Sequence, residues 1–357
     1  MKSDLNQSFI SLVKLGIGHD LDALFQNVNW VELKELAEKQ GLSAVVLDGI
    51  EKLPEQYRPP KVFLLEWIGE TLQGYEYRYE LYCRTIAEMA GFYNSHGHKM
   101  MVLKGYACSL DWPKPEHRPC GDIDIWLFGK YKEADAALAK EKGVEIDSSH
   151  HHHTVFYWRD FMVENHYDFI NVHHHKSNRE MENIFKELAS DDSYYIEING
   201  ECVYLPAPNL HALFLLRHMM AHFAAEQISF RHLLDWGFFV KAHTNEIDWP
   251  WLVGIINQYG MTPAYNIFNA ICVEDLGFDA SIFQKVQTNL SMKDKVLNEI
   301  LNPEFGMDLP KDLFRRVRFK IRRWRGSAWK HELCYNDGMW SAFWRGVWGH
   351  LLKPSSI

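Results

Sequence analysis

The sequence predicts an α+β protein, with a small mixed sheet in the middle of the chain and helices on either side of it. Apolar residues recur at helical spacing towards both ends of the 357 residues. Between them lie short apolar runs bounded by glycine and proline, which is typical of strands. We therefore place an N-terminal helical region at 1–97, an α/β core at 98–205 and a C-terminal helical domain at 206–357.

The N-terminal region has helical periodicity almost throughout. Phe9, Leu12 and Val13 begin an apolar stripe, and Pro59-Pro60 interrupts the pattern. A long, aromatic-rich helical pattern then runs over 62–93 and is expected to end in the turn at 94–97.

The middle region changes character. An apolar run at 99–103 predicts a strand, followed by a short helix at 106–110. A second strand is expected at 121–128, where alternation gives way to a fully apolar run. A helix over 130–142, ended by Gly143, and strands at 154–158 and 161–171 complete the core.

From Pro208 onward the periodicity is helical again. One helix is expected after Pro208 and another over 230–240. The remaining helices are expected to break at Pro250, Gly260, Pro303 and Pro310.

Composition excludes several classes of protein. A net charge of −9 argues against a chain built mainly to coat nucleic acid. The six cysteines form no C-x-x-C pair, which favours reduced thiols in a cytoplasmic protein. The first residues lack the order of a signal peptide, and no run of 18 apolar residues predicts a membrane span.

The most informative segment is 118–126, which contains Asp122 and Asp124. Alternate strand residues share a face, so both carboxylates are expected on one side and Ile123 and Ile125 on the other. Two carboxylates so close repel each other, and this repulsion raises the pKa of each. A divalent cation between them removes the repulsion. Oxygen ligands of this kind suit Mg²⁺ (or Mn²⁺) together with substrate phosphates. The alternative is an exposed strand with two solvated aspartates.

A glycine after a first strand, a short helix and then Gly-Asp-x-Asp-Ile resembles the DNA polymerase β nucleotidyltransferase superfamily. More narrowly, Val102-Leu-Lys-Gly105 with Arg118-x-x-x-Asp-Ile-Asp124 resembles a bacterial family of uncharacterised nucleotidyltransferases. The two-strand motif spans about 25 residues, and a weaker resemblance extends to about residue 240.

The resemblance implies a third carboxylate on a later strand. Glu164 fits this role best, with His166 two residues further on and therefore on the same face. Asn165 departs from the family, which usually has an apolar residue there, and this departure leaves Asp168 as the alternative.

The same resemblance places phosphate-binding residues at the turn after the first strand. Lys104 and Gly105 at this turn are candidates, together with Arg118 and Gly121 before the second strand, and arginine is the better bidentate partner for phosphate. The usual Gly-Ser or Gly-Gly pair is replaced by Gly105-Tyr106, a further departure. For both cations a surface salt bridge is the alternative role.

The implied activity is transfer of a nucleoside monophosphate from a nucleoside triphosphate, with Mg²⁺ or Mn²⁺ held by Asp122, Asp124 and Glu164. ATP is the expected triphosphate, although no residue favours it over CTP, GTP or UTP. The acceptor stays open among a small molecule, a sugar and a protein. Two other hypotheses remain: a nucleotide-binding module without turnover, and a histidine-rich protein that binds a transition metal.

Histidines are numerous and clustered. His218 and His222 share a helix face with His211, and the resemblance suggests that this helix lines the nucleotide cleft; buried, hydrogen-bonded histidines are the alternative. The resemblance also includes an arginine and an aspartate after this helix, near Arg231 and Asp235, for which an i, i+4 salt bridge is the alternative. The runs at 150–153 and 173–175, with His166, would suit zinc or another transition metal, or would be polar loops.

The segment 313–348 combines basic residues with apolar residues at helical spacing. Eight basic residues and no acid occur in 313–330. Such a helix would contact an anionic membrane surface or nucleic acid, or simply pack with a solvated basic face. Peripheral membrane contact is therefore an expectation for this segment, and no strong signal points to nucleic acid.

Overall fold

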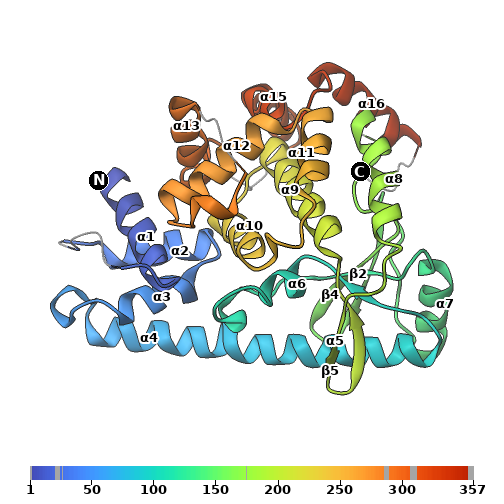
Figure 1. Ribbon diagram of the computed structural model, residues 1–357, viewed down its shortest axis with the longest axis horizontal. Helices are drawn as coiled ribbons and strands as arrows, with labels where there is room; N and C mark the ends of the chain where they lie inside the picture. The colour runs from blue at the N-terminus through green and yellow to red at the C-terminus, as the bar shows by residue number, and fades with distance from the viewer. Residues whose placement is uncertain are drawn as a thin grey trace.

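The computed structural model describes residues 2–20, 25, 27–173, 175–284, 289–305 and 312–352. It confirms the predicted α+β class, with a six-stranded mixed sheet and helices on both sides (Figure 1). His174 and Pro310 lie outside the described residues.

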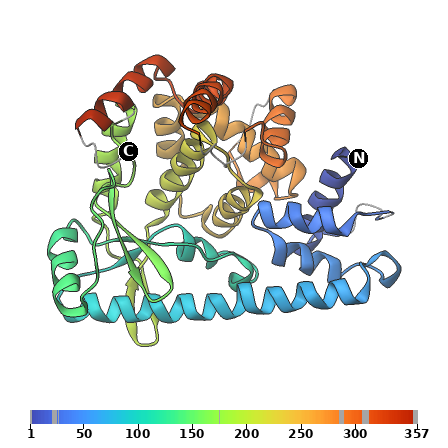
Figure 2. The same cartoon turned by 180° about the vertical axis from the view of Figure 1, so that it is seen from behind.

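The predicted long helix of the N-terminal region is present. Three shorter helices come first, α1 (Lys2–Gly16), α2 (Trp30–Lys39) and α3 (Ser43–Glu51), then the 3₁₀ turn η1 (Glu55–Tyr57). Helix α4 (Lys61–Thr71) continues through a π-helical turn, η2 (Leu72–Glu76), into α5 (Tyr77–Ser95). The three segments form one rod along the edge of the molecule (Figures 1 and 2).

The sheet has the strand order β3-β4-β2-β1-β6-β5. The strands are β1 (Met101–Val102), β2 (Ile123–Trp126), β3 (His153–Trp158), β4 (Phe161–His166), β5 (Tyr195–Ile198) and β6 (Glu201–Tyr204). β2 pairs antiparallel with β1 and parallel with β4, and β4 pairs antiparallel with β3. The helix α6 (Gly105–Ser109), the turn η3 (Pro115–His117) and the helix α7 (Tyr131–Lys142) join these strands.

Two elements were not predicted: the β5–β6 hairpin and helix α8 (Lys176–Leu188). The hairpin does have a sequence signal, because Asn199-Gly200 forms its two-residue turn. Both residues adopt positive φ, 51° and 83°, as a type I′ turn requires. The predicted strand at 161–171 was too long, because β4 ends at His166.

The two faces of the sheet have different partners. Ile123, Ile125 and Val163 are fully buried in one apolar cluster with Ile86 and Met89 of α5. Since successive strand residues alternate, the residues between them face the other way, towards the C-terminal helices. The sheet therefore buries its apolar face against α5 and presents its polar face to the rest of the molecule.

The C-terminal region is helical as predicted. Its elements are α9 (Pro208–Ala225), α10 (Phe230–His243), α11 (Trp249–Gln258), α12 (Thr262–Ala270), η4 (Ile271–Asp275), η5 (Ala280–Ile282), α13 (Leu290–Leu301), α14 (Leu313–Gly326), α15 (Ala328–Cys334) and α16 (Met339–Leu352). Phe9 of α1 packs edge-on against Phe230 of α10, with ring centroids 5.6 Å apart. No helix within the described ranges is long and apolar enough to cross a membrane.

Asn165, the residue that departs from the family pattern, belongs to a buried polar network on the α5 side of the sheet. Asp135 of α7 accepts hydrogen bonds from the Asn165 side-chain amide and the Thr154 hydroxyl, both at 2.8 Å. All three residues are buried. A polar side chain is tolerated at 165 because α7 supplies an acceptor for it, so the departure does not argue against Glu164 next to it.

Replacing Asp135 by alanine is expected to destabilise the protein by about 2–4 kcal/mol, because two buried donors lose their acceptor. Urea denaturation would measure the loss. The exposed Glu133→Ala on the same helix is the control and should change stability by less than about 0.5 kcal/mol. Equal effects of the two changes would show that the network does not stabilise the fold.

Candidate active site

A cavity of about 580 Å³ lies between the polar face of the sheet and helices α9 and α10. All ten residues predicted for the site line it. They are Lys104, Gly105, Arg118, Gly121, Asp122, Asp124, Glu164, His166, His218 and His222. Their gathering in one cavity was expected; their chemical roles remain predictions.

The parallel pairing of β2 with β4 places two of the predicted carboxylates side by side. Asp124 lies directly opposite Glu164 in the register. Asp122 precedes β2 and lines the same cavity. Asp168, the alternative third carboxylate, lies beyond the end of β4, pairs with Lys186 and is absent from the cavity wall. The structure therefore favours Glu164 over Asp168 as the candidate third carboxylate.

Asp124 is the most strongly paired carboxylate of the site. Its Oδ1 atom lies 2.6 Å from Lys104 Nζ and 2.9 Å from His166 Nε2. His166 Nε2 is also 3.5 Å from a Glu164 oxygen. One lysine and one imidazole thus share the charge of the buried Asp124 and the half-buried Glu164.

Because of these contacts, the pKa values of Asp122 and Asp124 shift in opposite directions. Burial and the neighbouring Asp124 raise the pKa of Asp122. Burial also opposes ionisation of Asp124, but Lys104 and His166 outweigh it and hold its pKa well below the usual range. The expectation that each aspartate would raise the pKa of the other is therefore wrong for Asp124. Burial likewise disfavours the charged form of His166, yet Asp124 and Glu164 raise its pKa.

The backbone between β1 and α6 is shaped by a close approach. Lys104 adopts φ 41°, a strained value for a residue with a side chain. At Gly105, a Cβ atom would lie 2.6 Å from the Tyr82 hydroxyl oxygen. That hydroxyl donates a 2.7 Å hydrogen bond to the Asp122 carbonyl. Gly105 thus leaves room for Tyr82 to hold the segment that carries Asp122. A Cβ at Gly121, by contrast, would meet no described atom within 4 Å.

The donor set suits a divalent cation. One ligand atom each from Asp124, Glu164 and His166 lie within 4.8 Å of one another, and Asp122 lines the cavity beside them. Two carboxylates with further room for substrate oxygens match the way Mg²⁺ and Mn²⁺ bind in proteins. The residues present therefore fit the cation that the sequence predicts.

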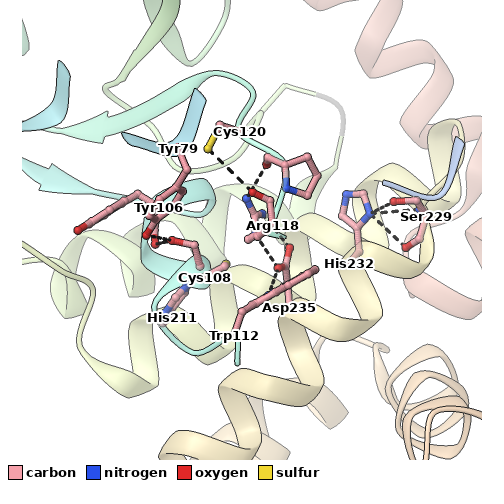
Figure 3. A network of polar contacts seen from close by, with 12 residues as sticks. Tyr79, Tyr106, Cys108, Trp112, Arg118, Cys120, His211, Ser229, His232 and Asp235 are labelled. Carbon is pink, nitrogen blue, oxygen red and sulfur yellow. Dashed lines mark hydrogen bonds and ion pairs between the residues drawn. The ribbon is translucent and has the colours of Figure 1, made fainter. Parts of the chain in front are cut away.

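Arg118 is already engaged within the protein. Its Nε and Nη2 atoms donate to the two oxygens of Asp235 at 2.7 and 2.9 Å, and Trp112 Nε1 donates to the same carboxylate at 2.9 Å (Figure 3). Arg118 and Asp235 are both buried, at 6% and 5% exposure. Arg118 therefore forms a salt bridge, the alternative to phosphate binding, but this salt bridge is buried and not on the surface. The Arg231–Asp235 pair suggested by their spacing is wrong, because Arg118 takes that carboxylate.

Arg231 emerges instead as an uncommitted cation of the cavity wall. None of the described residues forms an ion pair with it, and its Nε atom is buried without a hydrogen-bond partner among them. Burial and the nearby Arg118 lower its pKa. From the sequence, the helical salt bridge was one alternative for Arg231, and no sequence signal showed that Arg118, from a distant segment, would bind Asp235 instead.

The predicted histidine face of α9 divides between two environments. His218 and His222 line the cavity, with ring centroids 4.4 Å apart. Burial, and then the charge of Lys104, lower the pKa of both imidazoles. His211 lies outside the cavity wall, where its Nε2 contacts the thiol of Cys108 at 3.6 Å and its ring packs on Phe239.

The histidine run 150–153, which leads into β3, also lies in two different environments. His152 and His153 line the cavity, whereas His150 and His151 are absent from its wall. Burial lowers the pKa of His152 to about 2 and that of His153 to about 4. His175, from the second run, also lines the cavity.

The wall of the cavity formed by α8 and α9 includes residues that sequence analysis missed. Arg217 is fully buried, and its guanidinium donates to the side-chain oxygen Oδ1 of Asn178 (3.2 Å), the Ser177 hydroxyl and the backbone carbonyl of Cys334. It also lies 4.2 Å from the centre of the Tyr335 ring. Because α8 was not predicted, no signal placed these residues near the carboxylates.

The paired carboxylates of the sheet line a cavity between the sheet and the helices, an arrangement suited to binding a cation together with phosphates. Residues 26–276 match the model of a family described as uncharacterised nucleotidyltransferases, and the chain belongs to this family. The resemblance to a family of uncharacterised nucleotidyltransferases is thereby confirmed.

Other comparisons add little to this assignment. The chain is similar to the crystal structure of an antigenic nucleotidyltransferase-like protein from Paracoccidioides brasiliensis, at 12% identity and a TM-score of 0.37. The similarity covers 57% of this chain and 96% of that one. No curated protein matches the chain.

Replacing Asp235 by alanine is expected to destabilise the protein by about 3–5 kcal/mol, because the buried Arg118 guanidinium loses its counter-ion. The paired change Arg118→Met with Asp235→Leu should cost less, since it leaves no uncompensated charge. Equilibrium unfolding in urea measures both. A double variant as unstable as Asp235→Ala would show that the uncompensated charge is not the cause.

Proposed function

We propose that this protein is a metal-dependent nucleotidyltransferase of the DNA polymerase β superfamily, which transfers a nucleoside monophosphate from a nucleoside triphosphate to an acceptor. The main support is the register that sets Asp124 beside Glu164 at the wall of a cavity that Asp122 also lines. ATP is the proposed donor. The acceptor is a small molecule, a sugar or a protein.

Asp122, Asp124 and Glu164 would hold Mg²⁺ or Mn²⁺. When bound, the cation neutralises the charge that develops on the phosphate oxygens and on the attacking and leaving oxygens. Lys104 supplies a further positive charge beside Asp124. We propose that Lys104 turns from Asp124 to a phosphate oxygen when nucleotide and cation enter together.

Glu164 is the proposed acceptor of the proton from the attacking hydroxyl. Burial raises its pKa, but the hydrogen bond from His166 and the charge of Lys104 outweigh this and lower it overall. The carboxylate is therefore ionised near neutral pH and able to take a proton once it lies within hydrogen-bond reach of the acceptor.

Arg231 is proposed as the main contact for the triphosphate. It lines the same cavity as Asp122, and its Nε atom has no hydrogen-bond partner among the described residues, although the charges of Asp235 and Asp122 act on it. Arg118 would act indirectly, by holding α10 against the segment that precedes Asp122. His218 and His222 are proposed to line the nucleotide-binding part of the cavity from α9.

The single change Asp124→Asn is expected to lower nucleotidyl transfer by at least about 100-fold, because the site loses charge where the cation binds. Transfer from labelled ATP, CTP, GTP and UTP with Mg²⁺ or Mn²⁺ would be measured for the wild type, Asp122→Asn and Asp124→Asn. The control is Asp168→Asn, whose carboxylate does not line the cavity. Equal transfer by wild type and Asp124→Asn would exclude the proposed mechanism.

The same assay separates the enzyme from a binding module without turnover. Tight nucleotide binding by the wild type, with no pyrophosphate released on any acceptor tested, would favour the module. Loss of both binding and transfer in Asp122→Asn and Asp124→Asn would favour the enzyme.

Replacing Arg231 by glutamine is expected to weaken triphosphate binding by about 10- to 100-fold, the range for one charged hydrogen bond. Calorimetric titration with a non-hydrolysable ATP analogue would measure it. Arg84→Gln, an exposed change of the same charge on α5, is the control. If both variants bind the analogue equally well, Arg231 is not the phosphate contact.

Peripheral membrane contact through 313–348 stays a prediction. Within the described part of this segment, Phe314, Trp340 and Trp344 are 86%, 61% and 57% exposed. Exposed aromatic side chains next to the basic helix α14 are typical of a surface that binds an anionic bilayer.

A further inference from the structure

Three imidazoles converge on the side of the cavity formed by β3 and β4. One ring nitrogen from each of His152, His153 and His166 lies within 4.8 Å of the other two. His153 and His166 are 6% and 2% exposed. Such burial of several imidazoles next to one another is uncommon unless they share a ligand or a hydrogen-bond network.

The hydrogen bonds of these rings leave nitrogen atoms available. The Nδ1 atoms of His152 and His153 are buried and have no hydrogen-bond partner among the described residues. His153 Nδ1 and His166 Nε2 both point to the same oxygen of Glu164, at 3.6 and 3.5 Å. His166 Nε2 is hydrogen-bonded to Asp124, but the Nδ1 atoms of His152 and His153 stay unsatisfied, which costs free energy unless a further group completes the cluster.

His166 has the orientation common among histidines that bind metals. Its Nδ1 atom lies 3.2 Å from the Asp168 carbonyl, a contact that fixes the ring and directs Nε2 into the cavity. An ion bound at Nε2 would replace the proton that this atom now shares with Asp124.

Ligand chemistry distinguishes this cluster from the aspartate pair. Imidazole nitrogens favour zinc and neighbouring first-row transition metals, whereas Mg²⁺ favours oxygen ligands. Zinc–nitrogen bonds of about 2.0–2.1 Å require the nitrogens to lie within about 4 Å of one another. Small side-chain rotations would close the cluster to that size.

We propose that His152, His153 and His166 form a site for a transition-metal ion, zinc, with Glu164 beside it as a fourth ligand. This site goes beyond the proposed nucleotidyl transfer, because the ion would bind in the absence of nucleotide. It would adjoin the cation held by Asp122, Asp124 and Glu164, with Glu164 shared between the two ions. Since His166 contacts Asp124, occupancy would fix an imidazole beside the reacting phosphate and order β3 against β4.

The test is zinc binding by the full chain. Protein stripped with a chelator would be titrated with Zn²⁺ alone, in competition with a chromogenic chelator, and its bound zinc counted after dialysis. We expect about one tightly bound ion per chain. His153→Ala and His152→Ala should each weaken binding by at least about 100-fold, since even outer-shell partners of a metal site contribute about 10- to 100-fold.

The matched control is His151→Ala, from the same run of histidines but absent from the cavity wall. It should bind zinc like the wild type. Thermal unfolding with and without Zn²⁺ shows whether each variant is folded, and His153→Gln replaces His153→Ala if the latter is not. No tight zinc in the wild type, or equal loss in His151→Ala and His153→Ala, would overturn the proposal.

A further variant separates this proposal from the proposed enzyme activity. Asp122→Asn should retain the zinc ion while losing transfer. Zinc binding without any transfer in the wild type would leave the histidine site standing and remove the nucleotidyltransferase. Transfer without zinc would do the reverse. Co²⁺ offers a second readout, because a tetrahedral site gives it a visible spectrum that a solvated ion lacks.

Discussion

The cavity depends on one constraint, the strict alternation of side chains along β2. Ile123 and Ile125 are buried against α5, so Asp124 between them has to face the other way. A slip of one residue would bury the aspartate in the apolar cluster and expose both isoleucines. The free energy of apolar burial therefore holds a carboxylate at a place where its own desolvation is unfavourable. Lys104 and His166 offset that desolvation.

Much of this arrangement could be predicted from the sequence because it is local. The alternation around Asp122 and Asp124, the long helix at 62–93 and the helical end of the chain follow from periodicity within one segment. Glu164 could not be predicted from local periodicity, because its place beside Asp124 depends on the parallel pairing of β2 with β4. The family resemblance indicated this residue instead. The residue that argued against it, Asn165, is explained by Asp135 on a helix some thirty residues away.

What could not be predicted depends on contacts between distant segments. Arg118 and Asp235 are 117 residues apart, and their ion pair leaves Arg231 with a different environment from the one its spacing suggests. The α8 wall, with Asn178, was missed together with its helix. For the histidines, the run itself was visible, but only the fold separates His152 and His153, which face the cavity, from His150 and His151, which do not.

The ion pair between Arg118 and Asp235 also bears on how this protein can be divided. It connects the loop before the aspartates to a helix of the last third of the chain, across a boundary that composition alone suggests. An isolated sheet fragment would keep the carboxylates, yet expose an arginine that is buried in the whole chain, and it would lose one side of the cavity. Exchange of the C-terminal helices between relatives would therefore have to exchange both partners together, so that the acid and the base of the pair are inherited as one unit.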